Sequence, residues 1–170
     1  MFTCQCKVPI NLGDIFLADL GNCYKPELAF PHPVVIIEII GSMVLIVPSS
    51  TSPNIVNNAY HPIDNPTGND FYRKVKKSDG FNCDSALILS NLRAISQGRF
   101  LDHLGTLNNI NDPSSLFVEI KNKCFELCFP KQAISFKKAT EELNEIKKRM
   151  KQLEQENETL KSQKLNVGLS

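Results

Sequence analysis

The sequence predicts an α+β, β-rich domain followed by a separate long helix, and three patterns support this fold class. Short apolar, β-branched runs alternate with turn residues in the first half of the chain, helical spacing follows, and a heptad repeat begins at Phe136. A chain of 170 residues with 42% hydrophobic side chains suits one globular domain plus an appendage. We expect residues 1–132 to form the body and residues 133–170 to form a coiled-coil helix with a frayed C-terminus.

The first part of the body is predicted to be a strand followed by a central hairpin. Residues 14–20 (DIFLADL) form a short apolar segment after a glycine, and residues 21–32 are rich in turn residues. The segment PVVIIEIIGSMVLIVP then places two β-branched runs around Gly41-Ser42, a pair that suits a two-residue turn. Because both runs are almost continuously apolar, we expect this hairpin to be covered on both faces.

The rest of the body is predicted to contain more strands and then small helices. Residues 49–70 are polar and turn-rich, with a short strand possible over 56–62. An exposed strand (71–77), a turn at Ser78-Asp79-Gly80, a buried strand (85–90) and two segments with helical spacing (98–104 and 114–129) follow. Strands that precede small helices predict a barrel or a rolled sheet of the α+β type.

The tail carries the heptad repeat of a two-stranded coiled coil. Its a and d positions are Phe136, Ala139, Leu143, Ile146, Met150, Leu153, Asn157 and Leu160. In a parallel homodimer, each charged g residue would face an oppositely charged e residue, five positions later, on the other chain. The pairs are Glu142–Lys147, Arg149–Glu154 and Glu156–Lys161. The alternatives are a solitary solvated helix, a helix folded back on the body, and a helix that binds another protein.

Composition excludes some classes of function. The formal net charge of +1 argues against a broad basic surface for nucleic acid, so any RNA site must be local. The N-terminus lacks the pattern of a signal peptide, and the apolar runs are too short to span a membrane, so we expect a cytoplasmic protein with reduced thiols. Cys4, Cys6, Cys124 and Cys128 do not have the spacing of a common zinc motif, and we expect neither a metal nor a cofactor.

Three segments together resemble the MazF/PemK family of toxin endoribonucleases from toxin–antitoxin systems. They are GDIFLADLG (13–21), HPVVII (32–37) with VPSSTS (47–52), and GFNCDSALILSNLRAISQGRFLDHLGTL (80–107). The resemblance covers about residues 10–110 and leaves the tail outside. It implies an SH3-like small β-barrel of the MazF/PemK/CcdB type that dimerises. It also implies metal-independent cleavage of single-stranded RNA and neutralisation by an antitoxin protein.

The resemblance also suggests catalytic residues. The family keeps an arginine before the proline of the first hairpin, where this chain has His32, and a threonine or serine after the second strand, where it has Ser50 or Thr51. A histidine can act as base or acid near neutral pH, whereas an arginine mainly stabilises charge. If His32 is the base, Arg93 or Arg99 is the candidate cation.

Two of these assignments have alternatives. Arg93 could instead form a structural ion pair with Asp19 or Asp84. The departure from the family arginine at His32 equally suits a catalytically weakened barrel that binds RNA or protein. In that alternative function, the coiled coil sets the oligomeric state or recruits a partner.

RNA binding would need a local basic site, and residues 71–77 (FYRKVKK) provide the densest one in the body. Arg73, Lys74, Lys76 and Lys77 could contact phosphates, and Tyr72 could stack on an unpaired base. The same pattern is also typical of a solvated strand whose lysines prevent edge-to-edge aggregation.

Overall fold

The computed structural model describes residues 8–24 and 28–167, with only the backbone given for residues 162–167. The chain divides into two compact units, one ending at Cys128 and the other beginning at Phe129. None of the helices within these described ranges is long and apolar enough to cross a membrane.

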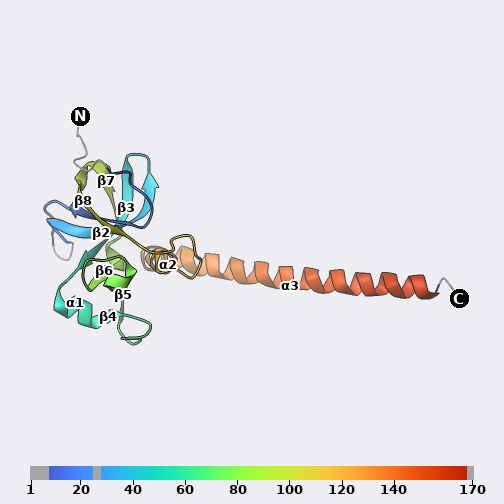
Figure 1. Cartoon of the computed structure of the whole chain (residues 1–170). Coiled ribbons are helices and arrows are strands. Elements are labelled where there is room, and N and C mark those ends of the chain that lie inside the picture. The colour runs from blue at the N-terminus through green and yellow to red at the C-terminus, as the bar shows by residue number, and fades with distance from the viewer. Residues whose placement is uncertain (1–7, 25–27, 168–170) are drawn as a thin grey trace. The chain divides into compact units, whose positions relative to one another are not determined.

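The first unit is a mixed α+β body built on an eight-stranded sheet. Its strands are β1 (Asp14–Asp19), β2 (Pro31–Ile40), β3 (Met43–Ser50), β4 (Ala59–Tyr60), β5 (Asn69–Val75), β6 (Ser85–Ile88), β7 (Arg93–Ser96) and β8 (Phe100–Thr106). They are ordered β4-β5-β6-β3-β2-β1-β8, with β7 also paired to β3. Figure 1 shows β4, β5 and β6 gathered at one end of the body and β7 and β8 at the other.

The predicted barrel is not closed by strand pairing. Within the described residues, β4 and β8 are the two ends of the strand order and do not pair with each other. Strand β4 has only two residues, too few to extend the ladder toward β8. The sheet is therefore open and rolled, a shape that twisted β-strands produce when the sheet does not close.

The predicted hairpin is confirmed. Strands β2 and β3 pair antiparallel from Ile40↔Met43 to Val34↔Pro48, with an irregularity near Glu38. Gly41 has a φ of +61° in the turn, a left-handed conformation that glycine adopts without a steric penalty. The predicted first strand (14–20), the strand over 71–77 and the strand over 85–90 are also present, as β1, β5 and β6.

Two segments differ from their predicted structure. Residues 98–104, expected to be helical, form a short 3₁₀ turn (η3, Gln97–Arg99) and then strand β8, which pairs with β1. Phe100 of β8 packs its ring 4.7 Å from that of Phe16, so pairing and packing override a short local pattern. The strand possible over 56–62 is present only as the two residues of β4, because residues 56–58 belong to helix α1 (Pro53–Asn58), whose Pro53 suits the first turn of a helix.

Both faces of the sheet are buried, which explains the continuously apolar strands. One core cluster contains Ile15, Val35 and Val47 with Phe117, Ile120 and Cys124 from helix α2 (Leu116–Cys128). The other contains Phe16, Ala18, Val34, Ile36, Ile46, Ile95 and Phe100. Neighbouring residues on β1, β2 and β3 alternate between the two clusters, as strand geometry requires.

The second unit is a single helix, α3 (Pro130–Val167), of 38 residues. Its predicted seam is open to solvent, since the large apolar side chains at these positions remain about half exposed: Leu143 50%, Ile146 58%, Met150 55%, Leu153 48% and Leu160 58%. The predicted helix is confirmed, and its pairing with a second copy stays a prediction.

Candidate functional site

The start of β2 and the end of β3 bring His32 next to Ser49, the residue before the predicted Ser50. Ala18 of β1 pairs directly with His32, so the half-buried imidazole lies on the same sheet face as the core residue Ala18. On the other side, Nδ1 of His32 lies 3.2 Å from the carbonyl oxygen of Ser49. His32 thus lies beside the residue that precedes the predicted Ser50, and the catalytic role of both residues stays a prediction.

The two candidate hydroxyls differ in accessibility. Ser50 is only 8% exposed, and its Oγ accepts a hydrogen bond of 3.2 Å from the backbone N–H of Ser52. Thr51 follows the strand and is exposed. The neighbouring Ser49 is fully buried, and its Oγ donates to the carbonyl oxygen of Pro33. The hydroxyl that a ligand can reach most easily is therefore that of Thr51.

An aromatic residue with unusual backbone geometry precedes the site. Phe30 has a φ of +65°, which is rare for a bulky side chain, and it is 64% exposed. Its N–H donates to the carbonyl oxygen of Gly21 (2.8 Å), and its carbonyl oxygen accepts from the N–H of Leu20 (3.2 Å). These two bonds close the β1–β2 loop two residues before His32, a constraint that the sequence did not reveal.

The two candidate arginines both donate to backbone carbonyl oxygens of segments that flank the β1–β2 loop. Nη1 of Arg99 donates to the carbonyl oxygen of Asp19 (3.1 Å). Asp19 follows Ala18, the residue of β1 that pairs with His32. Arg93 pairs with Ile46, four residues before Ser50, which corresponds to about 13 Å along β3. Nη2 of Arg93 donates to the carbonyl oxygen of Leu28. Both guanidinium groups therefore hydrogen-bond to backbone carbonyl oxygens near the end of β1 or just before β2.

The predicted basic cluster on β5 is not one surface. Arg73 is 7% exposed, while Lys74 and Lys76 lie on the opposite face and both reach the carboxylate of Asp64. The hydrogen bond from Lys76 holds the pKa of Asp64 below its ordinary value. Lys77 is exposed, and Tyr72 is half-buried. Strand alternation separates the arginine from the lysines, so a ligand on this strand would meet the lysines and Tyr72.

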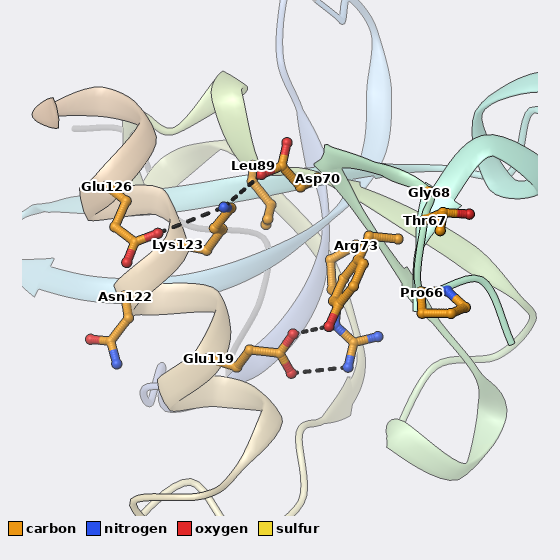
Figure 2. Close-up of a pocket in the computed structure, with 11 residues that line it drawn as sticks. Pro66, Thr67, Gly68, Asp70, Arg73, Leu89, Glu119, Asn122, Lys123 and Glu126 are labelled. Carbon is orange, nitrogen blue, oxygen red and sulfur yellow. Dashed lines mark hydrogen bonds and ion pairs between the residues drawn. The ribbon is translucent and has the colours of Figure 1, made fainter. Parts of the chain in front are cut away.

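Arg73 instead anchors a pocket of about 610 Å³ between β5 and α2 (Figure 2). Nε and Nη2 of Arg73 donate to the two carboxylate oxygens of Glu119, at 2.6 and 2.9 Å. Nζ of Lys123 lies 2.7 Å from Asp70 and 3.6 Å from Glu126, and the bond to Asp70 raises the pKa of Lys123. The pairs Arg73–Glu119 and Lys123–Asp70 join α2 to β5, and the pairing of Arg73 with Glu119 has no local sequence signal.

Cysteine chemistry offers little at this site. Cys4 and Cys6 lie outside the described residues. Cys124 is 1% exposed in the core, and burial raises its thiol pKa from 9.0 to about 12, so it stays protonated at neutral pH. Over residues 8–24 and 28–167, no group of three or more His, Cys, Asp or Glu side chains could hold a metal ion.

Comparison with solved structures finds similar chains, and a bacterial toxin is among them. The Mycobacterium tuberculosis toxin MazF-mt6 is 18% identical, with a TM-score of 0.44, and the match covers 67% of this chain and 97% of that chain. No protein-family model matches the sequence, and no curated protein does.

Proposed function

We propose that this chain is an endoribonuclease that cleaves single-stranded RNA without a metal ion, as the toxin of a toxin–antitoxin system. The order of the sequence motifs supports the proposal. The observation that carries it is the position of the His32 imidazole beside the end of β3, where Ser50 and Thr51 lie. The partners expected on this proposal are single-stranded RNA, an antitoxin protein and a second copy of the chain, in the cytoplasm.

The contact to Ser49 suggests the state in which His32 works. A carbonyl oxygen only accepts hydrogen bonds, so we assign the ring proton of neutral His32 to Nδ1. Nε2 then carries the lone pair and can accept a proton. In RNA cleavage this nitrogen would take the proton of a 2′-hydroxyl while the 2′-oxygen attacks the adjacent phosphorus.

The remaining steps need a cation and an acid. As the 2′-oxygen bonds to phosphorus, negative charge grows on the phosphate oxygens, which the Arg99 guanidinium, whose Nη1 donates to the carbonyl oxygen of Asp19, and the exposed Thr51 would stabilise. The bond from phosphorus to the 5′-oxygen then breaks. The His32 imidazolium returns its proton to that oxygen, which leaves a 2′,3′-cyclic phosphate and a 5′-hydroxyl.

The test is cleavage of an unstructured RNA oligonucleotide in EDTA, with products identified by mass spectrometry. We expect cyclic-phosphate ends, and we expect His32→Ala to slow cleavage at least about 100-fold, the usual contribution of a general acid–base group. His61→Ala is the matched control, because His61 is also a histidine but lies next to Asp64, away from β2. Cleavage that is equally fast in both variants would defeat the assignment of His32.

A catalytically weakened barrel that binds RNA or protein is the second candidate. The burial of Ser50 and its hydrogen bond to the Ser52 N–H favour this alternative, because the hydroxyl is already engaged. RNA that binds to the wild-type chain and is recovered intact after long incubation would support it. Cleavage that is sensitive to Thr51→Ala but not to Ser50→Ala would instead support the nuclease that uses the exposed hydroxyl.

A further inference from the structure

Helix α3 presents an apolar stripe that no residue of its own helix covers. The stripe runs from Leu143 to Leu160, about 26 Å along the helix axis, and its large side chains are 48–58% exposed. The intervening positions are charged or polar. A stripe with alternating steps of three and four residues is the pattern that a second helix covers in a coiled coil.

The charges beside this stripe specify how a second copy would lie. In a parallel, in-register pair, each g residue faces the e residue five positions later on the other chain. All of these contacts then join opposite charges: Glu142–Lys147, Arg149–Glu154 and Glu156–Lys161. Each contact occurs twice in the symmetric pair.

The antiparallel arrangement is disfavoured by the same residues. There g residues face g residues, and with full overlap Glu142 would meet Glu156 and Arg149 would meet its own copy. The e residues would also face like charges, with Lys147 against Lys161. A shift by one heptad removes the repulsion but leaves part of the apolar stripe uncovered, so the parallel pair is favoured.

Asn157 adds information on the number of strands. It occupies an a position, where a buried asparagine lowers stability but favours two strands in register, because its amide pairs with that of the other chain. The other large a and d residues are Leu143, Ile146, Met150, Leu153 and Leu160.

We propose that residues 136–160 of α3 form a parallel, two-stranded coiled coil with a second copy of this chain. Both helices then begin at the same end of the pair, so the two bodies are joined at that end through Phe129 and Pro130. Dimerisation through the tail is independent of the nuclease proposal and would hold for a binding protein too.

The direct test is disulfide cross-linking of the full chain with Asn157→Cys. In a parallel pair the two introduced thiols face each other, whereas in an antiparallel pair position 157 lies opposite the other end of the stripe. Gln155→Cys is the matched control, because position 155 is two residues away on the outer side of the helix. Peptide mapping by mass spectrometry separates these links from those of the native cysteines.

We expect at least a tenfold greater yield of 157–157 links than of 155–155 links. Equal yields at the two positions would overturn the proposal. In the Asn157→Cys chain, the triple change Glu142→Lys, Arg149→Glu and Glu156→Lys makes every g–e' contact repulsive. It should reduce the yield severalfold, and an unchanged yield would also overturn the proposal.

A charge-complementation control distinguishes repulsion from misfolding. A second Asn157→Cys variant with Lys147→Glu, Glu154→Lys and Lys161→Glu should also cross-link poorly alone. Mixed with the first triple variant, it should recover the wild-type yield, because all contacts are attractive again. Failure to recover, with both variants helical by circular dichroism, would count against the parallel pair.

Asn157→Leu provides an independent measurement. We expect it to shift the mass of the full chain in sedimentation toward species with more helices per coil, while Asn144→Leu on the outer face does not. Identical masses for the two variants would contradict the placement of Asn157 inside the pair.

Discussion

Loss of the Glu119 carboxylate should destabilise the body because it leaves Arg73 unpaired in a buried position. Arg73 is 8% exposed at its side chain and makes two hydrogen bonds to Glu119, while Nη1 donates to the carbonyl oxygen of Lys74 at 2.7 Å. Its guanidinium carbon also lies 5.8 Å from the ring centre of Tyr60. Glu119→Gln keeps the size of the side chain but removes its charge and one acceptor.

The expected magnitude follows from the exposure of the two partners. Breaking a fully buried ion pair costs about 3–5 kcal/mol, and an exposed pair contributes about 0–1 kcal/mol. Because the Glu119 side chain is 43% exposed, water can replace part of the lost interaction. We therefore expect Glu119→Gln to lower the free energy of unfolding by about 2 kcal/mol, intermediate between these limits.

Arg73→Met should cost less, although it removes the same pair. Methionine leaves no buried charge without a partner, and its apolar chain fills much of the space of the arginine stem. We expect a loss below about 1 kcal/mol. This asymmetry separates a structural ion pair from a general loss of packing.

The assay is urea unfolding of the full chain at one fixed protein concentration, followed by tyrosine signals from the body. Glu126→Gln is the matched control on the same helix, since Glu126 is 61% exposed and lies 3.6 Å from Lys123. It should change stability by less than about 0.5 kcal/mol. An equal loss in Glu119→Gln and Glu126→Gln, or a larger loss in Arg73→Met than in Glu119→Gln, would refute the reasoning.

Three further outcomes are expected. The pKa of Cys124 is about 12 in the folded body and lower when unfolded, so stability is retained below about pH 9 and lost as pH rises toward 12. Cys124→Ala should make that alkaline loss shallower, by up to about 1.4 kcal/mol per pH unit, in urea titrations at each pH. Gly80→Ala should destabilise far more than Gly41→Ala, because both glycines have positive φ but a Cβ at Gly80 would lie 2.3 Å from the carbonyl oxygen of Thr106. If RNA binds at β5, Lys77→Ala should reduce the slope of log affinity against log salt by about 0.7, and an unchanged slope would place the RNA elsewhere.

Local patterns in the sequence predicted most of the secondary structure correctly. The hairpin around Gly41 follows from two β-branched runs and a turn pair, all within about twenty residues. Helices α2 and α3 follow from the spacing of apolar residues, because a helix is stabilised by contacts between near neighbours along the chain. Resemblance to known motifs also directed attention to His32, whose imidazole lies 3.2 Å from the carbonyl oxygen of Ser49, the residue before Ser50.

The errors occurred where distant segments meet. Residues 98–104 have spacing compatible with a helix, and only pairing with β1 and the packing of Phe100 on Phe16 make them a strand. Likewise, Arg73 looks like its lysine neighbours in the sequence. The side chain of Arg73 lies on the face of β5 that is turned toward α2, so it is buried against Glu119, 46 residues away.

By itself, then, the sequence determined the hairpin, most of the strands, the helices α2 and α3 and the charge pattern of the tail, because each depends on residues close together along the chain. Only the tertiary structure decided which polar residues are buried or accessible. Contacts between remote strands placed Ser50 inside and Thr51 outside, and brought His32 to the backbone of Ser49. Such contacts depend on sheet register and packing, which no short stretch of sequence specifies.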